Sequence, residues 1–507
     1  MNIKTEPEQI WQEYQDGIGY NSNINLYDTV EKNENFYVGD QWVGVNAPDL
    51  EKPVLNVLKR VCTYFISMLV TDDIGVSFNP FYGQRDELIE QLEDEIERVI
   101  ERTKLKSLNR FLLRDACVDG DCAVYFYFDA DEGEWGEIKC EEVYNTRIMF
   151  GNPYIHDVES QPFILVKRRG MYEEVKERAA QGDDLRPDDD SEFTEQATNN
   201  QKMVTTVVKF WKNDEGQVMM KEIADNGVVV TEETNTMLTL YPVAYMSWEK
   251  VKNNYHGRAA ITGLIPNQIF VNKMWAMAMQ HVKMTSFPKI VYDKTKFLSG
   301  WSNKIGEAVG VAGDPATAVN TVTRTAELSA QVLTLVDKTI EYTRDFMGAS
   351  DAALGNIKPD NTSAIIAVQK ASSAPLELQR LAFYQFVEDY VRIIIDIIRH
   401  YYGVRVTKDG SAVIDFSAIP YDAMQMNVDV GASAYWSELT RVQTMDNLFE
   451  KGIVTDAVTY LESVPDQYVP NKDKIIQQLE EQKQLQQQMQ GGVQNGAMPA
   501  VQNAAVY

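Results

Sequence analysis

Apolar positions in the first half of the chain follow a helical period and then change to the alternation that is typical of strands. Residues 54–70 predict a buried helix, and residues 87–115 predict a second helix whose outer face is acidic. Residues 1–52 are polar, with aromatic islands such as Phe36–Tyr37. Runs rich in β-branched and aromatic residues then predict strands at 123–128, 137–143, 163–168, 203–211, 217–223 and 227–231.

The second half of the chain is mainly helical. Residues 260–286 and 326–347 predict two helices, and a short strand is expected between them at 289–292. A long helix begins near Thr362, and Pro375 should kink it because proline lacks the helical hydrogen-bond donor. The remaining pattern predicts short strands at 404–430, helices at 438–451, 453–463 and 473–490, and a disordered low-complexity tail at 491–507.

The two helices at 260–286 and 326–347 are similar in length and are joined by a compact insert. At a rise of about 1.5 Å per residue, each spans roughly 30–40 Å, so we expect an antiparallel pair with the insert at its tip. Each helix carries small or Met-rich faces, and the pair alone would leave apolar surface exposed. Side-by-side packing with copies of the chain would cover this surface in a ring. A hairpin buried inside one large domain is the alternative, and the pattern does not choose between them.

Composition bounds the class of protein only loosely. The 507 residues suffice for more than one domain with a core. The net charge of −27 disfavours a protein that grips DNA by neutralising phosphates. Either nucleic acid is irrelevant, or the protein lets DNA pass without binding it tightly. The acidic insertion at 181–201 is expected to be a solvated, mobile segment and not a metal site.

The expected environment is a cytoplasm. The four cysteines, Cys62, Cys117, Cys122 and Cys140, form no CxxC pattern, so we expect reduced thiols. The first residues lack the apolar region of a signal peptide. No uncharged run approaches the ~20 apolar residues that a membrane helix needs.

Motifs of catalysis are absent from the sequence. The four histidines are scattered, and neither HExxH nor GxxxxGK[ST], GxSxG or GxGxxG occurs. The acidic turn at 129–136 has glycine and an acid in the wrong order for a calcium loop. We therefore expect no enzyme activity, no cofactor and no metal.

Four motifs occur in one order in the second half of the chain. The first is Tyr255-His256-Gly257-Arg258, followed by Ile265-Pro266-Asn267-Gln268 and Val271-Asn272-Lys273, and the second is Phe287-Pro288-Lys289. The third is Gly348-Ala349-Ser350-Asp351-Ala352-Ala353-Leu354-Gly355 with Asn361-Thr362-Ser363-Ala364, and the fourth is Val428-Asp429-Val430-Gly431 with Tyr435-Trp436-Ser437-Glu438. In this order they resemble parts of the portal proteins of tailed bacteriophages: the start of the first stem helix, the step into the clip, the tunnel loop and the turn toward the crown. The likeness in element order covers about residues 31–478, and it is strongest over 255–465. Its departures are the acidic insertion and the Gln-rich tail.

The resemblance implies an α+β portal fold with a mixed wing domain, a two-helix stem, a small α/β clip, a long kinked helix and a helical crown, assembled as a ring. The implied parts are the wing at 1–259 and 362–433, stem helices at 260–286 and 326–347, the clip at 287–325, the tunnel loop at 348–361, the crown at 434–490 and the tail at 491–507.

The resemblance also implies roles for particular residues. The tunnel-loop residues expected to contact DNA are Lys358, Asp360, Asn361 and Thr362. The stem residues expected to face the channel are Lys283, Lys338 and Arg344. The clip residues expected to dock the terminase or adaptor are Lys289, Tyr292, Asp293, Lys294, Lys296 and Trp301. An acidic channel wall would repel DNA, and a few cations would touch phosphates without trapping them. The Gly- and Asn-containing loop would grip or brake the DNA, or it would serve only as a passive connector.

The implied function is a structural portal at one capsid vertex, for DNA packaging and ejection. Implied partners are about eleven further copies in a dodecamer, the terminase large subunit, a head-completion or adaptor protein, the major capsid protein and scaffold, and weakly bound double-stranded DNA, with no membrane. The expected location is the virion, after assembly in the bacterial cytoplasm. The alternatives are another ring- or shell-forming head or tail protein, an enzyme of the packaging apparatus such as a nuclease or ATPase, and a soluble interaction module.

Overall fold

The computed structural model describes residues 3–429 apart from gaps, and beyond them only isolated positions. The gaps are 49, 71–74, 81–86, 133–134, 180–183, 189–201, 225–226, 287–288, 298–309, 323–329, 347–373, 407–412 and 420–423. The chain divides into two units, Met1–Val430 and Gly431–Tyr507, and the elements below belong to the first. The predicted tunnel loop, most of the predicted crown and the tail therefore lie outside the described residues.

The core of the first unit forms around a three-stranded antiparallel sheet. Its central strand β2 (Asp121–Asp129) pairs with β3 (Glu137–Val143) on one side and β9 (Val243–Ser247) on the other. Helices α5 (Leu105–Asp119) and α11 (Glu377–Ile397) pack on this sheet. The contact buries Phe126 of β2 against Tyr390 of α11, whose ring centroids lie 5.9 Å apart. The β2–β3 hairpin confirms the strand prediction, whereas β9 was not predicted.

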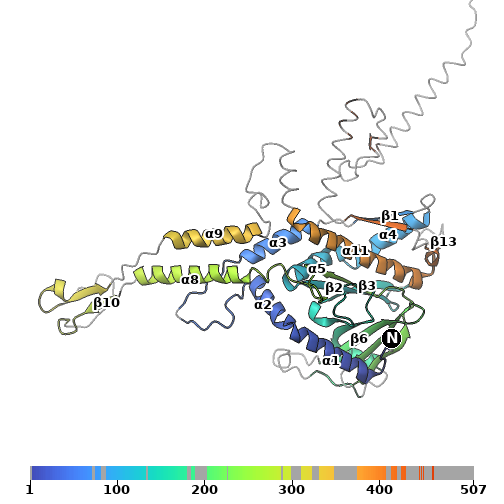
Figure 1. The fold of residues 1–507 in the computed structure, drawn as a ribbon, viewed down its shortest axis with the longest axis horizontal. Coiled ribbons are helices and arrows are strands. Elements are labelled where there is room, and N and C mark those ends of the chain that lie inside the picture. Colours follow the sequence, from blue (N-terminus) through green and yellow to red (C-terminus); the bar gives the residue numbers. More distant parts are fainter. Residues whose placement is uncertain are drawn as a thin grey trace, which may run out of the picture. The chain divides into compact units, whose positions relative to one another are not determined.

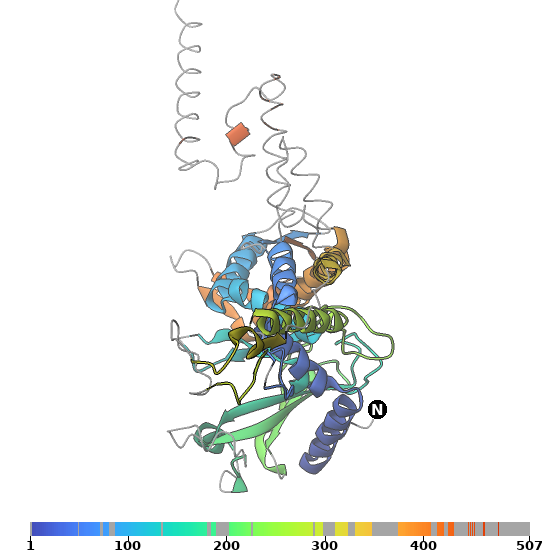
Figure 2. The same ribbon diagram turned by 90° about the vertical axis from the view of Figure 1, so that its left-hand side faces the viewer.

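A second sheet of five antiparallel strands follows the order β4-β5-β6-β7-β8. The strands are β4 (Ile148–Phe150), β5 (Phe163–Met171), β6 (Met203–Lys212), β7 (Val218–Ala224) and β8 (Val229–Asn235). Helix α1 (Pro7–Asn23) lies beside this sheet in Figures 1 and 2, and its Ile10 and Tyr14 share a buried cluster with Leu165, Val207 and Ile223 of the strands. Most of these strands are buried over several consecutive residues, as β6 is from Thr206 to Trp211, so their richness in β-branched and aromatic residues is what made them visible in the sequence.

Contacts of single side chains hold the N-terminal helix and part of the acidic insertion against this sheet. The buried Nζ of Lys209 donates to the Lys4 carbonyl over 2.7 Å and to Glu13 Oε2 over 2.5 Å. Part of the insertion is also packed, because Leu185 is buried in a cluster with Val175 of α6 (Tyr172–Arg178). Asp188 accepts a hydrogen bond from the Thr205 backbone N–H. The prediction of a wholly solvated insertion is therefore wrong at Leu185 and Asp188.

The helices of the first 120 residues differ from their prediction. Residues 1–52 contain α1 and α2 (Leu26–Val38), which were not predicted, and α3 (Val57–Leu69) confirms the first buried helix. The predicted helix at 87–115 is two helices, α4 (Glu87–Arg102) and α5, because Lys104 has a left-handed backbone with φ of 55°. The break lets α4 contact strand β1 (Gly75–Pro80) while α5 packs on β2.

The two helices of similar length form the expected antiparallel pair. They are α8 (Ile265–Ser286) and α9 (Ala330–Phe346), which lie side by side in Figure 1. Between them in sequence lies a ribbon of β10 (Lys289–Tyr292) and β11 (Val319–Val322), preceded on the β11 side by the short helix η4 (Pro315–Thr317). We call α8, the ribbon and α9 together the hairpin.

The last strand of the first unit pairs with a strand near its beginning. Pro375 lies in the short helix η5 (Ala374–Leu376), and α11 begins at Glu377. The residues before Ala374 lie outside the described part, so the predicted kink stays a prediction. After α11 come η6 (Ile398–Tyr402), β12 (Val404–Val406), β13 (Val413–Asp415), η7 (Phe416–Ala418) and β14 (Met424–Asp429), and β14 pairs with β1.

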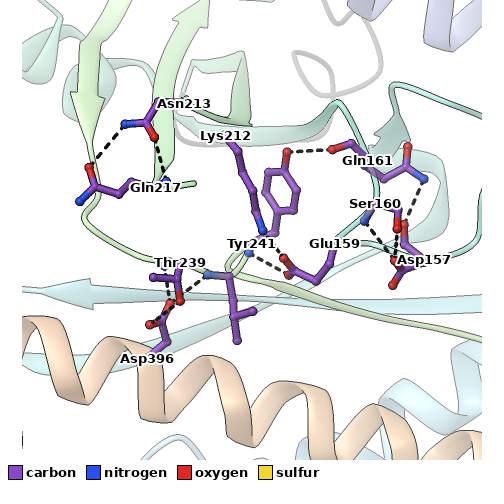
Figure 3. A network of polar contacts seen from close by, with 11 residues as sticks. Asp157, Glu159, Ser160, Gln161, Lys212, Asn213, Gln217, Thr239, Tyr241 and Asp396 are labelled. Atoms are coloured by element: carbon purple, nitrogen blue, oxygen red, sulfur yellow. Dashed lines mark hydrogen bonds and ion pairs between the residues drawn. The ribbon is translucent and has the colours of Figure 1, made fainter. Parts of the chain in front are cut away.

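A polar network joins α11 to the segment between the two sheets (Figure 3). Asp396 of α11 accepts hydrogen bonds from the backbone N–H groups of Thr239 and Leu240, at 2.7 and 3.0 Å. Glu159 accepts from Lys212 Nζ over 2.6 Å and from the Tyr241 N–H over 3.0 Å. Burial raises the pKa of Glu159, and Lys212 opposes that rise. These bonds satisfy the backbone of a buried connection, which would otherwise be costly.

Candidate functional site

The hairpin is anchored at its root by amide side chains of α8. Gln268 donates to the Leu55 carbonyl over 2.7 Å and accepts from the Val57 N–H over 3.0 Å. Asn272, one turn later, donates to Gln41 over 2.6 Å. Both amides are buried, and their bonds fix the direction in which α8 leaves the core. The motif that contained Gln268 and Asn272 was noticed in the sequence, but their anchoring role was not.

Helix α8 exposes apolar side chains on two opposite sides. At about 100° per residue, Met277 and Met284 share one side, and Met279 and Val282 share the opposite side. Met284 and Val282 are exposed to 62% and 58% respectively. Buried Ala278 lies between the two sides and marks the seam with α9.

Helix α9 repeats this arrangement. Val336 and Thr343 are buried at the seam with α8, and Asn267 of α8 donates to the Thr343 hydroxyl over 3.2 Å. At the same helical spacing, Leu333 projects on one side of the seam, while Leu335 and Tyr342 project on the other. These three side chains are 42%, 52% and 53% exposed.

The hairpin therefore has two apolar flat sides and two polar edges. An isolated helical pair needs apolar residues only along its seam, so side chains on both flat sides are not explained by the pair itself. Because both of its flat sides expose apolar side chains, the hairpin is suited to packing between two neighbouring copies. In a ring each copy has one neighbour on each side.

The two edges differ in charge. On the α9 edge, Lys338 Nζ lies 2.6 Å from Glu341 Oε2, and Asp345 is exposed beside them, whereas Asp337 lies with Arg344 on the flat side that carries Leu333. The hydrogen bond from Lys338 to Glu341 raises the pKa of the lysine. On the α8 edge, Lys283 Nζ lies 2.7 Å from Glu51 Oε1 and lowers the pKa of that carboxyl group. The α9 edge is thus the acidic one.

The structure separates the residues predicted to face a channel. Lys283 lies on the α8 edge, Lys338 lies on the α9 edge, and Arg344 lies on the flat side that carries Leu333. Lys283 and Lys338 thus lie on opposite edges of the hairpin, and their place along a channel stays a prediction. Lys358, Asp360, Asn361 and Thr362 of the predicted tunnel loop lie outside the described residues.

The predicted clip residues lie on the ribbon and in the turn that follows β10. Lys289 and Tyr292 belong to β10, and the Tyr292 ring packs edge-on against Phe297 at 5.0 Å. Asp293 accepts from the Thr295 hydroxyl over 2.6 Å, and Lys294 is exposed. Lys296 donates to the Thr317 hydroxyl over 3.1 Å. Trp301 lies outside the described residues.

Oxidation by dilute peroxide should report the exposure of the hairpin methionines. Exposed thioethers are oxidised before buried ones, so Met277 and Met284 should react several times faster than Met149 and Met246, each only 3% exposed. Peptide mass spectrometry at timed intervals measures the four rates. Equal rates in folded monomer would contradict the exposed flat sides.

A buried polar site, which the sequence did not reveal, lies just before the hairpin. His256 Nδ1 donates to Asp121 Oδ2 over 2.8 Å, and the Gly257 N–H donates to Asp121 Oδ1 over 2.5 Å. Both His256 and Asp121 are 1% exposed. A Cβ at Gly257 would lie 2.8 Å from the Gly120 carbonyl oxygen. This histidine thus joins the segment before α8 to β2.

An acidic cluster on α2 and α5 was also missed. Carboxylate oxygens of Glu34, Asp115 and Asp119 lie within 4.8 Å of one another. Arg114 forms ion pairs with Glu34 and, at 2.8 Å, with Asp115. Burial, with the nearby charges of Glu34 and Asp115, raises the pKa of Asp119 to about 8. A proton on Asp119 and the Arg114 guanidinium therefore both reduce the negative charge of the cluster.

Asp119→Asn should stabilise the protein at pH 8 and not at pH 4. The unfolded state releases this proton near its ordinary pKa of about 4, and the folded state keeps it until about 8. Between these values the folded state binds more protons, so stability falls as pH rises. We expect a gain of at least about 1 kcal/mol at pH 8. Urea unfolding of the variant at pH 4 and 8 tests this, with exposed Asp131→Asn as the control; equal effects at both pH values would contradict it.

Comparison with protein-family models and curated proteins identifies no relative of this chain. No protein-family model matches the chain, and no curated protein is significantly similar to it. Among the described helices, none combines the length and the apolar character that crossing a membrane requires.

Proposed function

We propose that this chain is the subunit of a portal ring at one vertex of a bacteriophage capsid, through which DNA is packaged and ejected. The observation that carries the proposal is the hairpin with apolar side chains on both flat sides. Such a hairpin fits between two copies of itself, and repetition of that contact around an axis leaves an opening in the middle. The four sequence motifs in portal order support the same function.

In this proposal the acidic α9 edge borders the channel. Glu341 and Asp345 repel phosphates, and Lys338 is held by Glu341 over 2.6 Å and does not trap DNA. The ribbon at the tip docks the terminase and later the adaptor protein. The capsid protein and scaffold contact other parts of the ring, and the assembled location is the virion.

Electron microscopy of the purified protein tests this function. We expect class averages of a ring, of about twelve copies, with a central opening at least as wide as the ~20 Å DNA duplex. A ring or shell without an opening would favour another structural head or tail protein. Monomers with bound nucleotide or divalent metal would favour an enzyme, and both outcomes would overturn the portal.

Peroxide footprinting complements the microscopy, because it reports the contact itself. Assembly should slow the oxidation of Met277 and Met284 on one flat side and of Met279 on the other. Protection of one side only would indicate a dimer, since a dimer contact covers the same face on both copies.

A further inference from the structure

A groove between α2 and the root of α8 has a cavity volume of 490 Å³. Its apolar lining includes Phe36, Trp42, Val43 and Ile269. The groove is held in shape by hydrogen bonds, since Trp42 Nε1 donates to the Pro53 carbonyl over 2.9 Å. Val43 is nevertheless 67% exposed, so this apolar surface is open to a partner.

The charges around the groove are mostly acidic. Asp28, Glu31 and Asp40 line it and are exposed, against the two lysines Lys32 and Lys273. An occupant that fits this groove therefore has an apolar centre with positive charges beside it.

One exposed surface of the same chain has that character. Phe111 of α5 is 59% exposed. Exposed Arg110 is adjacent in sequence, and exposed Lys104 immediately precedes the helix. An aromatic side chain with arginine beside it is typical of residues that dominate the energy of an interface.

The groove and this surface lie on opposite sides of α2. Asp28, Lys32 and Asn35 turn one face of α2 toward the groove, and helical spacing puts Tyr37 on the opposite face. The Arg114 guanidinium lies 5.0 Å from the centre of the Tyr37 ring, and Phe111 is one turn from Arg114 on α5. When a groove and a matching surface lie on opposite sides of a subunit, the groove of one copy can bind the surface of the next copy. This head-to-tail contact closes into a ring when it is repeated around an axis.

We propose that Phe111 and Arg110 of each copy dock in the groove between α2 and α8 of the next copy. This contact rests on the proposed ring and names a second interface in it, at the root of the hairpin. The occupant is a second copy, not a small ligand, because this chain carries a surface with the required apolar centre and opposite charge.

Cross-linking between differently tagged copies tests the contact. One copy carries Val43→Cys in the groove, and the other carries Ser107→Cys, which is exposed one turn from Phe111. Both are made in a Cys140→Ser background, because the other native cysteines are buried. The control pair combines Val43→Cys with Tyr154→Cys, a 67% exposed tyrosine elsewhere on the chain. Assembly of Phe111→Ala and Tyr154→Ala is measured in parallel by sedimentation.

We expect a disulfide between copies for the first pair and none for the control pair. Phe111→Ala should raise the concentration needed for assembly by about tenfold or more, and Tyr154→Ala should leave it unchanged. A ring that forms normally without the cross-link, and with Phe111→Ala, would overturn this contact and leave the portal standing. Failure of the unmodified chain to form any ring would overturn both.

Discussion

Replacing Met284 or Val282 by aspartate should convert the proposed ring into folded monomers. The two substitutions place a carboxylate on opposite flat sides of the hairpin, where Met284 and Val282 are 62% and 58% exposed in the single chain. The charge costs the monomer nothing, but in the assembled contact it is buried without a partner. That burial costs about 3 kcal/mol or more, which weakens association roughly a hundredfold.

Sedimentation velocity measures the loss of assembly, and circular dichroism checks the fold. The matched control is Lys283→Asp, which puts a carboxylate in the last turn of α8 but on its polar edge, beside Glu51. Each aspartate should act alone, because each blocks one of two neighbours. If only one of the two variants failed to assemble, a two-sided ring contact would be wrong.

Asp121→Ala should produce the largest loss of stability among the substitutions considered. Asp121 holds His256 over 2.8 Å and the Gly257 backbone over 2.5 Å in a site that is 1% exposed. Removing the carboxylate leaves the Nδ1 of buried His256 and the Gly257 N–H without their acceptor, and His256 keeps only the contact of its Nε2 with Asn21 Oδ1 at 3.1 Å. We expect a loss of about 3–5 kcal/mol in the free energy of unfolding.

Urea unfolding at neutral pH measures this loss. Asp121→Asn keeps an acceptor for the Gly257 N–H and should lose less. Exposed Asp131→Ala should stay within about 0.5 kcal/mol of the unmodified protein. A loss below about 1 kcal/mol for Asp121→Ala would show that the segment before α8 is held mainly by packing.

Several elements escaped prediction for reasons that the structure makes plain. Strand β9 (Val243–Ser247) is buried on both faces, so it has no polar alternation to recognise. Helix α1 buries only Ile10, Tyr14 and Asn21, and three positions give a weak helical period. The break between α4 and α5 lies at Lys104, without glycine or proline to indicate it.

The pattern of apolar and polar residues could not predict which segments far apart in the sequence come together. Strand β1 pairs with β14, so that Phe78 lies opposite Met426 from the far end of the unit. The acidic cluster likewise brings Glu34 of α2 to Asp115 and Asp119 of α5. In so acidic a chain, a pair of carboxylates carries no signal until the fold brings them together.

The sequence alone determined that two helices flank a short ribbon and that their apolar content exceeds what one seam can bury, because helical period and residue type are local properties. Only the tertiary structure decided that the excess lies on both flat sides, that Lys283 and Lys338 lie on opposite edges, and that Asp121 is the partner of His256. Those facts depend on contacts between residues far apart in the chain, and such contacts are set by packing and not by local pattern.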